Sequence, residues 1–172
     1  MRSFFRRRDR EVVVDRGSTK PYKITCCGGA EATLAMQDDG ICVIDIRGVF
    51  SRSTAHLAPM AHRAAVAMGA TGLLTRSDRA VLAITLEEYK VAGAILADEC
   101  DVPGAIVGPE ASRPTLYQIA RFACEHGHLR AVFSEMDEAF SWVRRQALMA
   151  QTVREQHVQA LRERIRALPR PE

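Results

Sequence analysis

The chain has 172 residues, of which 47% are hydrophobic and 26% are charged, and its formal net charge is +3. This length suits one domain with a buried core, and the composition excludes a wholly disordered chain. No apolar stretch approaches the roughly 18 to 20 residues that a membrane span needs, and the small net charge gives no sign of specific nucleic-acid binding. Because residues 1–16 do not follow the order of a secretion signal, we expect a cytoplasmic protein.

Residues 1–21 are predicted to form a basic N-terminal tail, since they show no sustained hydrophobic period. This segment is rich in arginine and also contains Phe4 and Phe5. One interpretation is that the basic run binds nucleic acid or an anionic membrane surface with the help of these phenylalanines. A solvated tail is the favoured interpretation. Val12 to Val14 could add an edge strand to a sheet. Across the whole chain, arginine far outnumbers lysine and asparagine is absent, a bias typical of GC-rich bacterial genomes.

The ordered part is predicted to begin near Ala30 with a β-hairpin. Alternating apolar residues over 30–36 indicate a half-buried strand, and Asp38-Asp39-Gly40 is a strong turn signal because glycine adopts positive φ easily. The apolar run Ile41 to Phe50 predicts a central strand. A helix capped by Ser53 or Thr54 should follow and run to about Met68, where Gly69 ends it.

Strands and helices then alternate to the end of the chain. Thr85-Leu86-Glu87-Glu88 has the S/T-x-x-E form of a capping box, in which Thr85 accepts from the Glu88 amide and Glu88 reaches back. Arg76 to Arg79 forms a polar break before it. The predicted strands lie at 72–75, 80–84, 105–107 and 129–133, and the predicted helices at 85–98, 115–125 and from Ser134 onward. This order predicts an α/β fold with a mixed, mostly parallel sheet and helices packed on it.

The final helix has no stop signal before Pro169, so it would be roughly 30 residues long, far above the mean of about 11 to 12. Its second half carries an apolar stripe at spacings of three and four, which must pack against something. We therefore expect self-association, with a homodimer interface formed by Val158, Leu161, Ile165 and Leu168. The chain is divided into a tail (1–21), an α/β domain (22–150) and a helical extension (151–172).

Three stretches resemble the STAS domain family, the anti-sigma-factor-antagonist-like proteins of bacteria. They are the opening hairpin with Ile41 to Phe50, the strand–loop–helix stretch Leu73 to Leu86, and the ending from Arg130 to Val143, which contains the sequence Asp137-Glu138-Ala139-Phe140-Ser141-Trp142. The resemblance spans roughly Ala30 to Gln146. It implies a STAS-like fold and a regulatory role in which the start of the second helix docks a protein partner or a small ligand.

In signalling members of that family, a Ser or Thr at the start of the second helix is phosphorylated within an Asp-Ser-Ser/Thr-Gly motif. The resemblance places Thr85 at the phosphoacceptor position, but Ala83 and Leu86 replace the acidic residue and the glycine. A helix cap is therefore the favoured role of Thr85, and a phosphorylation switch stays open as an alternative. The neighbouring residues Arg76, Ser77 and Arg79 are candidate contacts for an anion or a partner.

The densest group of metal-ligand types is Cys124-Glu125-His126-Gly127-His128. Zinc would need more ligands at a defined spacing, so a core cysteine and two histidines at a helix end are favoured over a metal or thiol site formed by Cys124, His126 and His128. Cys26-Cys27 is not C-x-x-C, and the five cysteines match no disulfide framework. Cys42 and Cys124 are expected to be small core residues.

No nucleophile or metalloprotease motif occurs, so we expect no catalytic residue, no cofactor and no resident metal. The leading hypothesis is a non-enzymatic, STAS-like binding module. A structural dimer without a ligand is the second hypothesis, compatible with the first, and a metal or thiol protein is the third.

Overall fold

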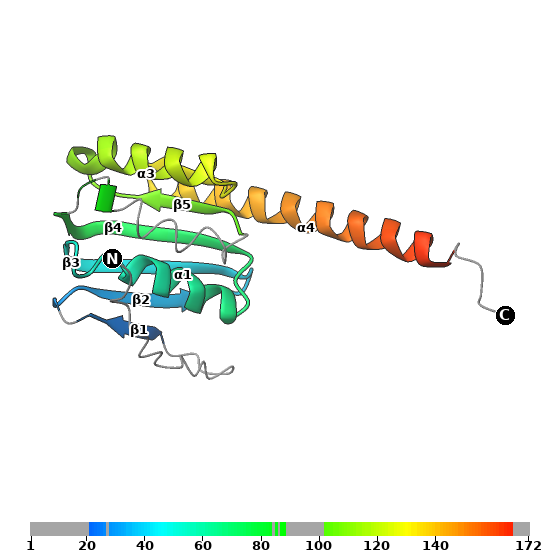
Figure 1. The fold of residues 1–172 in the computed structure, drawn as a ribbon, viewed down its shortest axis with the longest axis horizontal. Coiled ribbons are helices and arrows are strands. Elements are labelled where there is room, and N and C mark those ends of the chain that lie inside the picture. The colour runs from blue at the N-terminus through cyan, green and yellow to red at the C-terminus, as the bar shows by residue number, and fades with distance from the viewer. Residues whose placement is uncertain (1–20, 27, 84, 86, 89–101, 167–172) are drawn as a thin grey trace, which may run out of the picture.

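The computed structural model describes residues 21–26, 28–83, 85, 87–88 and 102–166, and within them it shows one mixed sheet (Figure 1). The sheet order follows the sequence, β1-β2-β3-β4-β5-β6. The first three strands pair antiparallel, and β3 to β6 pair parallel. The predicted fold class is thereby confirmed. The strands are β1 (Tyr22–Thr25), β2 (Glu31–Met36), β3 (Ile41–Phe50), β4 (Gly72–Leu82), β5 (Gly104–Val107) and β6 (Arg130–Phe133).

The helices cover the two faces of this sheet unequally. They are α1 (Leu57–Ala67), α3 (Arg113–Glu125) and α4 (Met136–Arg166), with a short 3-10 turn η1 (Glu110–Ser112) before α3. Because side chains alternate along a strand, neighbours in sequence enter different cores. Cys42 and Leu73 pack in the core under α1, whereas Ile41 and Leu74 pack under α4. Helices α1 and α3 thus cover one face and α4 covers the other.

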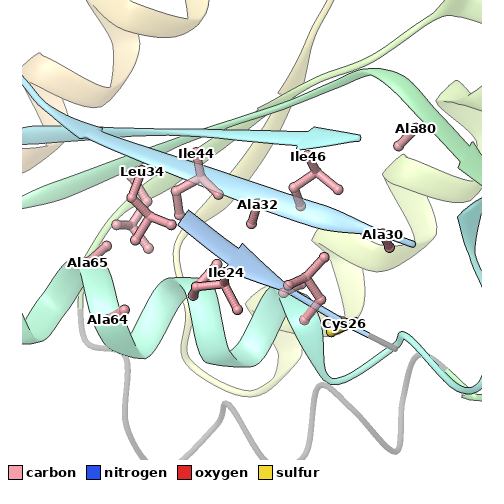
Figure 2. Packing of buried hydrophobic residues seen from close by; sticks show 14 of the residues in the cluster. Ile24, Cys26, Ala30, Ala32, Leu34, Ile44, Ile46, Ala64, Ala65 and Ala80 are labelled. Carbon is pink, nitrogen blue, oxygen red and sulfur yellow. The ribbon is translucent and has the colours of Figure 1, made fainter. Parts of the chain in front are cut away.

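Helix α1 packs closely on the sheet because its buried face is built largely of alanines. In Figure 2, Ala64 and Ala65 lie over Leu34 and Ile44, with Ile24 beside them. The predicted glycine signals at the ends of this region are confirmed. Gly40 turns the β2–β3 hairpin with φ +80°, and Gly69 follows the last residues of α1 with φ +93°. Both angles lie in the left-handed region that glycine adopts without steric cost.

The prediction that Ser53 or Thr54 caps α1 is wrong. The helix begins at Leu57 after His56, and no side chain bonds to its first amides. The buried Thr54 hydroxyl instead accepts from the Ser51 amide at 2.8 Å and lies 3.0 Å from the Val49 carbonyl oxygen. Its hydrogen-bonding capacity is therefore taken up by the turn that leaves β3. Similarly, α4 begins at Met136, so Glu135 rather than Ser134 precedes its first residue.

The sheet also contains a strand that the sequence analysis missed. β1 pairs along its whole length with β2, and the Cys26 amide donates to the Ala30 carbonyl at 2.9 Å in the turn between them. The strand is only four residues long, too short for a clear period of two. The suggested edge strand at Val12 to Val14 lies outside the described residues.

The predicted polar break at Arg76 to Arg79 is not a loop. β4 runs unbroken from Gly72 to Leu82, and the register with β3 shifts by one residue between Asp45 and Arg47. An extra residue in β4 is thus absorbed as a β-bulge, which lets a strand pass through a polar stretch without losing its pairing. Side chains alternate along a regular strand, so Ser77 and Ala80, three residues apart, would face opposite sides. Because of the bulge, Thr75, Ser77 and Ala80 are all buried.

The 31-residue helix α4 is continuous, as predicted, and at about 1.5 Å per residue it is about 46 Å long. Ala139, Val143 and Ala147 pack on the sheet, and Arg144 pairs with Asp39 of the β2–β3 turn. Beyond Ala147 the helix extends away from the sheet (Figure 1). None of the helices in the described part of the chain combines the length and apolar character that a membrane crossing requires.

Candidate functional site

The predicted capping box at Thr85 is present in the structure. The Glu88 amide donates to Thr85 Oγ1 at 3.3 Å, and Glu88 Oε2 accepts from the Thr85 amide at 3.0 Å. The Thr85 hydroxyl also donates to the same Oε2 atom at 3.1 Å. These bonds, followed by the nearby charge of Arg52, hold the pKa of Glu88 below its usual range. Thr85 therefore acts as a helix cap on an exposed surface.

This cap sits at the carboxyl ends of two central strands. The Ala83 amide donates to the Phe50 carbonyl at 2.7 Å, which holds the segment leading to Thr85 against the end of β3. Just before these ends, Val49 and Val81 lie opposite each other in the β3–β4 ladder. Both are exposed, at 48% and 61%. Arg52 lies near Glu88, and the bond from Ala83 to Phe50 joins the cap to the strands that carry the valine pair; these residues are together treated as a candidate surface, here named the docking surface.

The other predicted contact residues do not share one environment. Arg76 and Asp45 lie on the face of the sheet that α4 only partly covers, where Arg76 Nε lies 2.9 Å from Asp78 Oδ1 and 3.5 Å from Asp45 Oδ1. Asp45 also accepts from Arg47 Nη2 at 2.6 Å, and this bond raises the pKa of Arg47. Arg79 is exposed opposite Arg47. The arginines thus extend the docking surface along the open sheet face.

Ser77, in contrast, points into the molecule. It is 5% exposed, and its hydroxyl donates to the Val107 carbonyl at 3.1 Å across the β4–β5 pair. It cannot serve as the surface contact that was predicted for a polar loop, because the segment is a strand and this residue faces the helix-covered core. The structure therefore brings together Thr85 with the arginine-bearing face but separates Ser77 from both.

A buried polar cluster was missed by the sequence analysis. His62 of α1 is 6% exposed, and its Nε2 atom lies 3.3 Å from Thr75 Oγ1 of β4. His62 Nδ1 is buried, and it has no hydrogen-bond partner among the described residues. Burial, followed by the charges of Arg130 and His128, lowers the pKa of His62 to about 3. A buried polar atom left unpaired costs about 1–3 kcal/mol, so this site is energetically unusual.

The cluster lines a cavity of about 50 Å³ between α1, α3 and the central strands. Its position in the sequence did carry a signal. His62 lies four residues after Ala58 and three before Ala65, so it shares the apolar face of the predicted helix. Its partner Thr75 is 13 residues away in the sequence, and the packing of α1 on the sheet brings the two side chains into contact.

The Cys124–His128 group does not form a site. Cys124 is exposed at the end of α3, so the prediction that it is a core residue is wrong, whereas Cys42 is fully buried as predicted. Cys124 Sγ lies 3.4 Å from the Arg130 carbonyl, and His126 Nδ1 lies 2.9 Å from the Phe122 carbonyl. Within the described ranges, no three histidine, cysteine or acidic residues are grouped to hold a metal.

Another cysteine does contact a histidine. Cys26 Sγ is buried and lies 3.4 Å from His56 Nε2 just before α1, while Cys27 lies outside the described residues. Burial raises the pKa of Cys42 to about 11, so this thiol stays protonated at neutral pH.

The predicted self-association stripe is only partly described. Val158 is 40% exposed, Leu161 and Ile165 belong to α4 but their side chains lie outside the described set, and so does Leu168 as a whole. From Leu148 onward, every described side chain of α4 is exposed. At 100° per residue, Val158 lies three turns beyond Ala147 and on the same face, so the sheet-packing face continues into the extension.

A groove of about 530 Å³ lies where α4 leaves the sheet, lined by Val66, Ala70, Val102, Ala147 and Ala150 among others.

Comparison with known proteins identifies the fold. No protein-family model and no curated protein sequence matches the chain. A crystal structure of an anti-sigma factor antagonist from Mycobacterium paratuberculosis matches with a TM-score of 0.53 and 15% sequence identity, over 70% of this chain and 99% of that one. The chain has the fold of an anti-sigma factor antagonist. The STAS-like fold inferred from the sequence is thereby confirmed, and the match covers nearly all of the antagonist's own chain.

Proposed function

We propose that this chain is a non-enzymatic, cytoplasmic regulatory module of bacterial type that docks a protein partner through the docking surface. The observation that carries the proposal is the exposed capping box at the carboxyl ends of β3 and β4, on a fold shared with an anti-sigma factor antagonist. No cofactor and no specific nucleic acid enter this function.

The chemistry of the docking surface suits a protein partner. Val49 and Val81 form a small exposed apolar centre, and Arg52 and Arg79 lie near it. Protein interfaces combine an apolar centre with a polar rim, and arginine is enriched in them. The bonded cap at Thr85 holds the adjoining backbone in one conformation, which lowers the entropic cost of docking.

A phosphorylation switch at Thr85 is the alternative, and the contacts of Thr85 disfavour it. The hydroxyl proton is donated to Glu88 Oε2, so a phosphate on Oγ1 would remove that donor and place its negative charge beside the carboxylate. Repulsion between the two would break the capping box. We infer that Thr85 stabilises the docking surface as a cap rather than carrying a regulatory phosphate.

The docking proposal is tested by pull-down with the whole chain as bait, with quantitative comparison of variants. Val81→Glu and Arg52→Glu should each reduce recovery of a specific partner at least tenfold, because both change the centre of the docking surface. Tyr117→Glu is the matched control, since Tyr117 is 56% exposed on α3, away from that surface. Equal recovery by all three variants would count against the docking surface.

We further propose that the chain forms a homodimer through the extension of α4. Val158 of the apolar stripe is 40% exposed, and every described side chain of α4 from Leu148 onward is exposed. Most of the stability of a helix in a protein comes from packing of its apolar face. A second copy of the chain would cover the apolar stripe and the groove at its base.

Sedimentation distinguishes the two oligomeric states. Substituting Leu161 and Ile165 together by Lys should convert a dimer to a monomer of about half the mass. Gln159→Lys, on the same exposed stretch, adds charge without removing an apolar side chain and should leave the dimer intact. A mass that is unchanged by the double substitution would contradict the α4 interface, whatever the result at the docking surface.

A further inference from the structure

The apolar stripe of the α4 extension continues the side of the helix that packs on the sheet. Residues 148–166 extend about 28 Å beyond Ala147, and α4 runs on past the sheet without a kink (Figure 1). At about 100° per residue, the helical period places Val158, Leu161 and Ile165 within about 40° of Ala147. A second copy that covers this stripe must therefore approach α4 from the side on which the sheet lies.

This direction of approach decides how two copies can be oriented. Packed helices lie about 8–10 Å apart, so a second helix on this side of α4 enters the layer of the sheet. In a parallel pair, the first half of the second α4 would overlap the strands on which Ala139 and Val143 pack, β4 and β5. In an antiparallel pair, the first half of the second α4 lies beyond the end of the first helix. The two sheets then stay apart, and only the extensions meet.

The charges beside the stripe match the antiparallel orientation. When Val158 lies opposite Leu161 of the second copy, the flank of the stripe that carries Glu155 and Arg162 meets the same flank of the second helix. Glu155 of each copy then lies about two residues, or about 3 Å along the axis, from the level of Arg162 of the other. Both side chains are exposed in the single chain. Two-fold symmetry makes this contact between opposite charges twice.

A parallel pair would not provide this contact. Opposite flanks of the stripe meet in a parallel pair, so Glu155 would face Ala150 of the second copy, and Arg162 would face His157. Alanine carries no charge, and histidine carries none or a positive one. The charge pattern therefore agrees with the steric argument.

We propose, on the basis of the homodimer proposed above, that two copies pair antiparallel through residues 150–166 of α4, with Glu155 of each copy bonded to Arg162 of the other. Arg154 lines the groove where α4 leaves the sheet, and in this pairing it lies opposite Ile165 of the second copy. The last turn of a helix carries the negative end of its dipole, so a cation beside it is favourable. The groove thus receives the end of the second helix.

The antiparallel dimer leaves both docking surfaces free. The extension begins beside Val102 and Pro103, where β5 is about to start, whereas the docking surface lies at the opposite, carboxyl ends of the strands. The two docking surfaces therefore face away from the helix pair at its two ends. One dimer can bind two partner molecules without contact between them.

Charge reversal tests the pairing, with sedimentation equilibrium of the whole chain as the measurement. Glu155→Arg and Arg162→Glu each bring like charges together twice and should weaken dimerisation on the order of tenfold. An equimolar mixture of the two variants should dimerise as tightly as the unmodified chain, because each contact in the mixed dimer joins opposite charges. Glu163→Arg is the matched control. Glu163 is exposed about 160° around the helix from Ala147, so this variant should leave the dimer intact.

The doubly substituted chain, Glu155→Arg with Arg162→Glu, regains opposite charges at both contacts and should also dimerise. It keeps the test decisive if a single variant fails to fold. A dimer that neither reversal weakens, or that neither the mixture nor the double substitution restores, would overturn the antiparallel pairing and leave the homodimer itself standing. An unmodified chain that sediments as a monomer would refute the homodimer, and the pairing with it.

Discussion

Acidification from pH 7 to pH 5 should destabilise this protein through His62. Burial keeps the pKa of this imidazole at about 3 in the folded state, compared with the usual 6.5 in an unfolded chain. Below pH 6.5 the unfolded chain therefore takes up a proton that the folded chain does not accept. The free energy of unfolding is highest above pH 6.5 and falls as the pH is lowered from 6.5 toward 3.

The size of this effect follows from the two pKa values. Each pH unit within this window changes the free energy of unfolding by about 1.4 kcal/mol for one such group. Between pH 7 and pH 5 the loss is about 2 kcal/mol. At a urea dependence of about 2 kcal/mol per molar, the unfolding midpoint should fall by about 1 M. Glu88 and Asp39 have lowered pKa values, so their contributions are lost only at more acidic pH.

Urea unfolding at pH 7 and pH 5, followed by circular dichroism, measures this loss. The His62→Leu variant should lose most of the difference between the two pH values, because its side chain does not titrate. His157→Gln replaces an exposed histidine of the α4 extension and should keep the full difference. A midpoint that falls equally in the His62→Leu and unmodified chains would refute the assignment to this residue.

Three further changes test the folded framework by urea unfolding at pH 7. Thr85→Ala removes the hydroxyl that accepts from the Glu88 amide and should cost about 1 kcal/mol, whereas Thr85→Ser should cost little. Leu57→Ala should cost about 3 kcal/mol, because the side chain of this first residue of α1 is fully buried in the core and its loss leaves a cavity. Gly48→Ala should cost more than about 1 kcal/mol, since φ is +89° and the new Cβ would lie 2.9 Å from the Gly29 carbonyl oxygen. An unchanged midpoint in any of these alanine variants would contradict the corresponding contact.

The capping box is the part of the candidate site that the local sequence predicts. Thr85 and Glu88 are three residues apart, and their reciprocal bonds are made within one turn, so the motif predicts its own geometry. The contact residues nearby were harder to predict. The polar run Arg76 to Arg79 is compatible with a loop or with a bulged strand. In the structure it forms a strand, because β4 pairs with β3 along this stretch. That pairing turned Ser77 inward and left Arg79 exposed.

What the sequence determined by itself is the order of the described elements from β2 onward, although not the unbroken course of β4, together with the turns at Gly40 and Gly69, the cap at Thr85 and the continuous final helix. These features depend on hydrogen bonds and backbone angles within a few residues, and glycine, threonine and glutamate specify them locally. Only the tertiary structure decided that β1 joins the sheet, that α4 packs on the face opposite α1, and that His62 meets Thr75 beside a cavity. Those features arise from packing between elements distant in sequence, where burial and shape rather than local propensity select the contacts.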